Sequence, residues 1–298
     1  EIMPSLVGSE MCIRDSYNCE SFIALAVRSV LDQTYKNFEL IITDDGSKDK
    51  TVDILHHFDD PRIIIISDGE NHGIVYRLNQ QIKLAKGKYF VRMDGDDIMF
   101  PDRIERQVAF LETHKEVDVV GGSAVIIGDD NEIIGMRGYV KGEDVYTCTG
   151  FIHPTVCAKI EFFRKYKYRD ELKGIEDFDL WTRSNKVAIF KILNDPVLFY
   201  RDPLKFKLKT YLFRQEQCRN GLRNWLQESL ITRNIYNKML LLAYLKSILA
   251  ICMHVIKCDS YMIKRRNQSC PLDMKLRYQT LLNQITKSCL YLLTTLFT

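Results

Sequence analysis

Apolar positions in the first part of the chain switch between two kinds of spacing. Ile23, Ala26, Val27 and Val30 recur at intervals of three and four residues, which is the spacing of one buried helical face. Short apolar runs follow such segments and are typical of strands buried in a sheet. In chain order, the pattern predicts a helix over 21–31, a strand over 38–43, a helix over 51–58, a strand over 62–67, a helix over 73–85, a strand over 88–93 and a helix after Pro101. We therefore expect an α/β fold with right-handed βαβ units and a mostly parallel sheet covered by helices on both faces.

The pattern changes beyond Lys115, and the charge changes further on. Strands are predicted over 117–127 and 133–140, short helices over 161–166 and 177–185, and mainly helix from Lys205 onward. Residues 205–298 hold sixteen Lys and Arg against four Asp and Glu, a net charge of +12; because the whole chain carries +3, residues 1–204 carry −9. We therefore predict an acidic α/β domain over 1–204 and a basic helical region over 205–298.

Two acidic turns each follow a predicted strand. They are Asp44-Asp45-Gly46-Ser47 and Asp94-Gly95-Asp96-Asp97. In open α/β sheets, ligands bind outside the carboxyl ends of the strands, where both turns are expected. Three carboxylates within four residues repel one another, and a Mg²⁺ or Mn²⁺ ion that also binds substrate phosphates would relieve this repulsion. The alternative for each turn is an exposed acidic loop or a helix cap, but two such turns at one edge favour a ligand site.

Motifs along residues 17–183 resemble the family 2 glycosyltransferases of GT-A (Rossmann-like) fold, which are inverting enzymes that use nucleotide sugars. Their order and spacing carry the resemblance. The motifs are Tyr17-Asn18, the run from Ser29 to Thr34, the run from Glu39 to Thr51, Asn71-His72-Gly73, the block from Gly87 to Arg103, and the run from Glu176 to Trp181.

The resemblance implies a site for a nucleotide sugar, with a UDP-sugar as the default. By similarity, Tyr17 stacks on the nucleobase and Asp45 hydrogen-bonds it, with Asp44 in the same turn. Asn71 and Gly73 shape a loop near the nucleotide.

The helix predicted over 73–85 also contributes a binding residue by similarity. Asn79 is included among the residues that bind the nucleotide sugar. Many relatives place an Arg immediately before that position, where this chain has Leu78. We therefore do not assign a phosphate to Arg77.

The resemblance also implies which residues bind the phosphates and the metal and which residue acts as the base. Asp94 faces ribose or phosphate, Asp96 binds a divalent cation (Mn²⁺ or Mg²⁺) that bridges the diphosphate, and Asp177 is the catalytic base. A positioned carboxylate can accept the proton of the attacking hydroxyl, and a metal can neutralise the leaving group. Asp179 is a substitute candidate for the base, and an acidic first turn that complements a helix dipole is the structural alternative for this motif. His153 falls where the family often has a His beside the acceptor cleft, although a lone His is more often structural.

The N-terminal segment departs from the family. Relatives begin with a hydrophobic strand leading into Tyr-Asn, whereas residues 2–16 read IMPSLVGSEMCIRDS. Gly8, Glu10 and Arg14 interrupt the nearly continuous apolar run that a buried parallel strand normally shows. We therefore expect no central strand here, and predict that residues 1–16 are a non-native scar of cloning or sequencing.

The basic region contains one strongly apolar segment, from Met239 to Ile256. It includes Lys246 and His254, and its 18 residues barely reach the length needed to span a bilayer, so a buried helix is predicted. The alternative is an interfacial helix on an anionic membrane, to which Lys264-Arg265-Arg266 would add attraction. The sequence has no zinc-finger spacing, RNP-like motif or helix-turn-helix, so we expect no nucleic-acid partner.

Compartment and function follow from these patterns. The nine cysteines form no CxxC pair and no export segment is recognisable, so we predict reduced thiols and a cytoplasmic protein, or one peripheral on the inner membrane face. The predicted function is inverting transfer of a sugar to a glycan or lipid-linked acceptor in surface polysaccharide synthesis. The alternatives are a nucleotidyltransferase, which usually needs a Gly-rich basic loop, and an inactive GT-A domain that acts as a binding or scaffolding protein.

Overall fold

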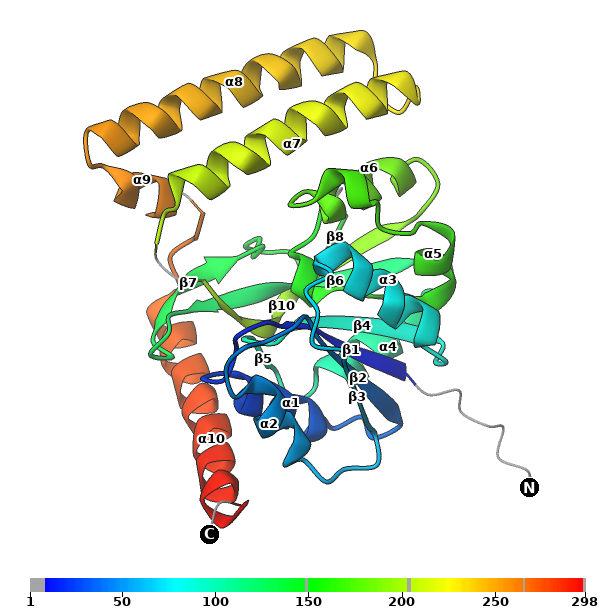
Figure 1. Ribbon diagram of the computed structural model, residues 1–298, viewed down its shortest axis with the longest axis vertical. Coiled ribbons are helices and arrows are strands. Elements are labelled where there is room, and N and C mark those ends of the chain that lie inside the picture. Colours follow the sequence, from blue (N-terminus) through cyan, green and yellow to red (C-terminus); the bar gives the residue numbers. More distant parts are fainter. Residues whose placement is uncertain (1–8, 148–149, 203–204, 265, 297–298) are drawn as a thin grey trace.

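The computed structural model describes residues 9–147, 150–202, 205–264 and 266–296, and within these segments ten strands form one sheet (Figure 1). The order across the sheet is β3-β2-β1-β4-β9-β6-β10-β5, with β7 beside β6 and β8 beside β10. The strands are β1 (Ser9–Ser16), β2 (Phe38–Asp44), β3 (Ile63–Ser67), β4 (Tyr89–Asp94), β5 (Ile98–Met99), β6 (Val119–Ile127), β7 (Ile133–Arg137), β8 (Val145–Tyr146), β9 (Cys157–Lys159) and β10 (Phe190–Arg201).

The sheet has a parallel half and a mixed half. Strands β3, β2, β1 and β4 are parallel neighbours. The alternating pattern predicts β2, β3 and β4 but not β1. Beyond β4, strand β9 is antiparallel to both β4 and β6, while β6 and β10 are parallel. The parallel half carries the acidic turns at the ends of β2 and β4.

Helices cover both faces of the sheet. On one face, α1 (Ile23–Leu31), α2 (Thr51–His56) and α4 (Arg103–Thr113) bury residues such as Val27, Leu55 and Ile104 against the sheet. On the other face, α3 (Ile74–Leu84), α5 (Ile160–Lys165) and α6 (Glu176–Ser184) enclose a second cluster that includes Phe163 and Trp181. The short helices η1 (His153–Thr155) and η2 (Asp170–Leu172) lie in the connections around α5. The predicted α/β layering is confirmed.

The expectation of no central strand before Tyr17 is wrong. Strand β1 lies between β2 and β4 and pairs with both in parallel, with Cys12 opposite Ile41 on one side and Arg92 on the other. Backbone hydrogen bonds to two neighbours form whatever the side-chain pattern is, so polar positions here do not prevent pairing. Residues 1–8 lie outside the described residues. The predicted foreign origin of this segment stays a prediction, which resequencing of the source gene checks.

The basic region after β10 separates into two parts in space (Figure 1). Helices α7 (Leu208–Gln227) and α8 (Arg233–Val255) form a long hairpin beside α6, held by a cluster that includes Ile175, Leu222 and Trp225. After α9 (Asp259–Lys264), helix α10 (Leu272–Leu296) returns to the sheet, where Tyr278 and Leu282 are buried with Phe199. The domain boundary at residue 204 stays a prediction. Helix α10 belongs to the predicted helical region but packs on the α/β body.

Helix α8 is not the buried helix that the sequence predicts. Leu241, Leu245 and Ile248 are each more than half exposed. Within the described residues, α8 is the one helix long and apolar enough to cross a membrane by length and composition, and 11% of its most apolar window is buried. Among the described residues, the apolar surface of α8 therefore has few partners.

Candidate functional site

The ends of the parallel strands bring the predicted site segments to one edge of the sheet. In the register of β1, Ser16 lies beside Asp44 at the end of β2, and Arg14 lies beside Asp94 at the end of β4. Tyr17 follows β1 directly and is 47% exposed. The two acidic turns and Tyr17 therefore share this edge.

Asp44 organises the first acidic turn. Its Oδ2 accepts hydrogen bonds from the amides of Gly46 and Ser47, both at 3.1 Å, and from Ser67 Oγ at 3.2 Å. Gly46 has a φ of +78°, and a Cβ there would lie 2.8 Å from the carbonyl carbon of Glu70. Only glycine fits this close approach without displacing the 70–73 loop.

Asp45 has protein partners on both carboxylate oxygens. The amides of His72 and Gly73 donate to it at 2.8 and 3.0 Å, and Arg77 Nε donates at 3.1 Å. Arg77 is fully buried and also pairs with Asp68, whose pKa it holds well below the ordinary range. Asp45 and Arg77 thus fix the loop between β3 and α3. The predicted bond from Asp45 to a base stays a prediction.

The remaining predicted nucleotide residues lie in different surroundings. Asn71 is exposed in the loop over Gly46, and Gly73 begins α3 with a φ of +83°. Asn79 does not share this loop: its amide donates to the Tyr168 carbonyl at 2.9 Å and accepts from the Tyr168 amide at 3.1 Å. These two bonds tie α3 to the segment before η2. Asn79 lines another hollow, beside Tyr76 and Lys83, so its predicted contact with the nucleotide sugar finds no support in the geometry.

The second acidic turn follows β4. Asp94 and Asp96 are half-buried, and Asp94 Oδ1 accepts a hydrogen bond from Arg92 Nη2 at 2.6 Å. Asp97 is fully buried: its Oδ1 accepts from the Arg201 amide at 2.8 Å, and its Oδ2 has no hydrogen-bond partner. Burial, and then the charges of Asp96 and Asp94, raise the pKa of Asp97 well above its ordinary value. Burial is thus the main cause of this shift, and the two neighbouring carboxylates add to it.

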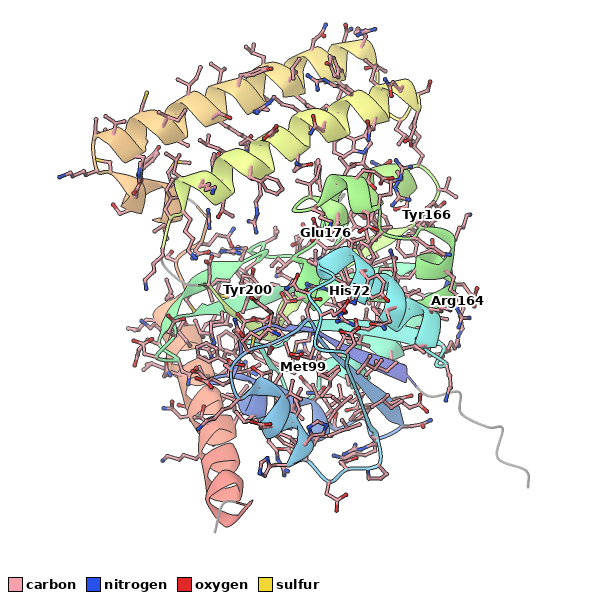
Figure 2. The ribbon with its side chains drawn as sticks, viewed as in Figure 1. His72, Met99, Arg164, Tyr166, Glu176 and Tyr200 are labelled. Atoms are coloured by element: carbon pink, nitrogen blue, oxygen red, sulfur yellow. The ribbon has the colours of Figure 1, made fainter. Side chains whose placement is uncertain are left out.

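Asp94 and Asp177 line the same cavity, which has a volume of about 540 Å³. Asp94 comes from the end of β4 and Asp177 from the first turn of α6. Glu176 and Tyr200, which also line it, are labelled in Figure 2 and lie between the α7–α8 hairpin and helices α1 and α2. The other lining residues are Ile74, Arg92, Arg137, Phe151, Ile152, His153, Pro154, Gly174 and Arg214.

The geometry separates the two candidate bases on α6. Asp177 is half-buried at the cavity, whereas Asp179 is fully buried. Asp179 accepts hydrogen bonds from Trp225 Nε1 and Arg183 Nε, both at 2.8 Å. Asp179 therefore joins α6 to α7, and of these two candidates Asp177 is the one that lines the cavity.

His153 has a structural partner and a place at the cavity. Its Nε2 lies 2.7 Å from the Tyr168 hydroxyl, and its ring meets Trp181 edge-on. The side chain is 8% exposed. His153 lines the same cavity as Pro154 and Asp177.

Three arginines in the cavity lining were not selected from the sequence. Arg92 is buried, and its Nε and Nη1 have no hydrogen-bond partner. Arg137 donates to Asp202 at 2.6 Å, and Arg214 comes from α7. Arginine pairs well with phosphate oxygens, so these side chains suit an anionic ligand. A basic residue inside the apolar run of β4 was the signal for Arg92.

The fold and site can be compared with solved structures. Staphylococcus aureus TarS (residues 1–349), solved with UDP-GlcNAc, matches with a TM-score of 0.62 and 19% identity over 78% of this chain and 70% of that chain. The same protein solved with UDP matches with a TM-score of 0.56 over 72% of this chain and 66% of that one. The likeness shows a shared fold, and it confirms the predicted GT-A architecture.

Sequence relatives identify the family. EpsE of Bacillus subtilis, named as a glycosyltransferase, is 33% identical over 222 residues, which are 68% of this chain and 79% of the relative. An Escherichia coli enzyme, UDP-Glc:alpha-D-GlcNAc-diphosphoundecaprenol beta-1,3-glucosyltransferase WfaP, is 43% identical over 100 residues, 34% of this chain and 40% of the relative. The sequence profile described as Glycosyl transferase family 2 matches residues 13–188, more than half of the chain. This chain therefore belongs to glycosyl transferase family 2, and the predicted glycosyltransferase function is confirmed.

Proposed function

We propose that this glycosyltransferase moves a sugar, with inversion, from a UDP-sugar to a hydroxyl of a glycan or lipid-linked acceptor in surface polysaccharide synthesis. The observation that carries the proposal is the single cavity that Asp94 and Asp177 share with three arginines. The bound UDP and UDP-GlcNAc of TarS and the acceptor in the name of WfaP support the choice of donor and acceptor.

Asp177 is the general base of the proposed reaction. An acceptor hydroxyl must lose its proton as it attacks the anomeric carbon, and a carboxylate at the cavity can accept that proton. The bonds of Asp179 to Trp225 and Arg183 hold α6 in place, so Asp179 is a positioning residue in this scheme. His153 and its partner Tyr168 shape the wall beside the base.

The donor would lie between the loops at the carboxyl edge and the cavity. Tyr17 offers an exposed ring for stacking on the base, while Asp44 and Asp45 hold the turn and the Asn71–Gly73 loop in position. Arg92 offers two buried donor groups without a partner, which suit the negative charge of a diphosphate.

The second acidic turn would supply part of the ligand set of a divalent cation. Among the described residues there is no group of three or more His, Cys, Asp or Glu that could hold an ion. Mg²⁺ usually takes one or two carboxylates and leaves other positions to water and substrate phosphates. Asp96, with Asp94 beside it, would supply the carboxylates. When bound, Mn²⁺ or Mg²⁺ would neutralise charge on the departing diphosphate.

The test of this function is incubation with a panel of nucleotide sugars, with and without an acceptor, followed by detection of the released nucleoside diphosphate. We expect release with one or a few UDP-sugars, dependent on Mn²⁺ or Mg²⁺ and stimulated by acceptor. Release of pyrophosphate from a nucleoside triphosphate would instead favour the nucleotidyltransferase. Binding of nucleotide sugar without any turnover would favour the scaffolding alternative.

The exposed apolar side of α8 also belongs to the proposal. A helix with Leu241, Leu245 and Ile248 exposed, in a region of net charge +12, suits the surface of an anionic membrane. Of the KRR run, Arg265 lies outside the described residues. Six cysteines in the described segments are free thiols, which supports a reducing, cytoplasmic setting at the inner membrane face.

Vesicle sedimentation measures this membrane contact. We expect the protein to sediment with phosphatidylglycerol vesicles at low salt, and Leu245→Gln combined with Ile248→Gln to weaken binding by about tenfold, because less apolar surface is buried in the interface. The matched control is Ile64→Gln, which changes an exposed residue on the distant edge strand β3. Equal sedimentation of the helix variant and the control would contradict the proposal.

A further inference from the structure

A second cavity lies between α6, α7 and α8. It has a volume of about 260 Å³, and apolar side chains from all three sides line it, including Ile175, Leu222, Met239 and Leu242. It shares Gly174 and Asp177 with the cavity of the proposed active site. The two cavities therefore meet at the proposed base.

Five of the side chains that line this second cavity carry polar groups: Asp177, Gln215, Cys218, Trp225 and Lys246. Lys246 of α8 and Asp177 belong to its lining, and both charges act on Cys218 of α7. Burial, as the main cause, raises the pKa of the Cys218 thiol. Trp225 also lines the cavity, but its indole N–H already donates to Asp179. The other lining residues are apolar or glycine, so an occupant with many buried polar groups would leave some of them without partners, which is costly.

The apolar character continues from the cavity onto the surface of α8. Leu242 lines the cavity and is 44% exposed, so it belongs to both. Leu245 and Ile248 extend the apolar surface along the same helix. A flexible hydrocarbon chain could thus pass from a membrane along α8 into the cavity without leaving apolar surroundings.

We propose that this cavity binds the head-proximal part of the hydrocarbon chain of a phosphate-linked lipid acceptor, with the lipid phosphate at Lys246 and the acceptor sugar at Asp177. The assignment rests on the proposed function, because it places the acceptor of that reaction. At about 30 Å³ for each group of the size of a water molecule, the cavity holds roughly nine such groups, so it takes only a short stretch of chain. A peptide segment fits less well, because its backbone N–H and C=O groups would be buried without partners.

Trp225 provides a direct measure of occupancy. The chain has two tryptophans, and Trp225 lines this cavity while Trp181 lies in the cluster between the sheet and α5. Bromine quenches indole fluorescence at short range, so a dodecyl phosphate brominated on its chain, kept below its micelle concentration, should give saturable quenching. Unbrominated dodecyl phosphate should compete, and Trp225→Phe should abolish the signal.

Two exposed leucines of α8 give a matched pair of variants. Leu242 lines the cavity, whereas Leu241 does not and is 60% exposed. We expect Leu242→Glu to raise the Kd for the brominated alkyl phosphate by about tenfold, and Leu241→Glu to change it less than about twofold. Lys246→Gln should weaken binding of the alkyl phosphate but not of an uncharged brominated alkyl glycoside. Quenching that is absent, or reduced equally in both leucine variants, would overturn the assignment.

Transfer assays separate this inference from the proposed function. With a lipid diphosphate acceptor, Leu242→Glu should raise KM by about tenfold, while a water-soluble glycan acceptor without a lipid should be used as before. Transfer to the soluble acceptor without cavity binding of the alkyl phosphate would disprove the inference and keep the function. Cavity binding without transfer to any acceptor would disprove the function and with it the acceptor role of the cavity.

Discussion

Sugar transfer should fall by about 100- to 10,000-fold in Asp177→Asn while binding of the nucleotide sugar is unchanged, because the amide keeps the shape of the side chain but cannot accept a proton. Asp177 lines the same cavity as Asp94 and the arginines, and the isosteric amide leaves the shape of that cavity unchanged. Single-turnover assays with UDP-sugar and acceptor measure the transfer step. Calorimetry with UDP measures donor binding separately.

Asp179→Asn is the informative comparison for this variant. Asp179 is buried and accepts hydrogen bonds from Trp225 and Arg183, so its neutral form should loosen the contact between α6 and α7. Weakening a buried, charge-assisted hydrogen bond costs about 1.5–3 kcal/mol, which thermal unfolding should detect. Wild-type turnover in Asp177→Asn, together with a loss of transfer in a well-folded Asp179→Asn, would show that Asp179 and not Asp177 is the general base.

The parallel half of the sheet could be predicted because its signals are local. The runs that form β2, β3 and β4 are apolar and each ends in a turn, so they needed no tertiary information. Strand β1 could not be predicted in this way, because its place depends on backbone pairing with two neighbours. Strand β10 was missed because Asn194, Asp195 and Pro196 interrupt its apolar pattern, and the pairing register shifts at Pro196.

The exposure of α8 could not be predicted from the sequence. Its apolar composition predicts burial, but composition does not say whether the partner is protein or membrane. Within the described residues, α8 packs on α7 and leaves much of its surface uncovered. Only the arrangement of the hairpin beside α6 reveals this.

The candidate site was predictable in its residue types and less so in its contacts. Asp94 and Asp177 are far apart in sequence and meet at one cavity, as the resemblance to the family implies. The internal partners of Asp45 and Asn79 depend on loops that no local pattern fixes. Arg137 and Arg214 come from β7 and α7, which the sequence alone does not place beside the acidic turn.

Asp96→Ala should abolish the metal-dependent part of nucleotide-sugar binding and leave the fold intact. The backbone carbonyl of Asp96 accepts a hydrogen bond from Arg201 Nε at 2.9 Å, and alanine keeps this bond. Removing the carboxylate takes away a charge that repels Asp97 and also a charge that attracts the guanidinium of Arg201, so the two effects oppose each other and the melting temperature without metal should change little. Loss of even an outer-shell residue typically costs 10- to 100-fold in metal affinity, so a direct ligand should cost at least about that much.

Calorimetry with UDP, with Mn²⁺ and then with EDTA, measures the effect of Asp96→Ala. Asp102→Ala is the matched control, because Asp102 is a carboxylate at the start of α4, outside the second acidic turn, and its side chain is 51% exposed. The control removes the same charge, so it should keep the full difference between Mn²⁺ and EDTA. If the difference in UDP affinity between Mn²⁺ and EDTA is as large in Asp96→Ala as in the control, Asp96 is not a metal ligand. Binding of UDP by the unaltered protein that is equally tight in EDTA would show that this enzyme holds its donor without a metal, through groups such as Arg92.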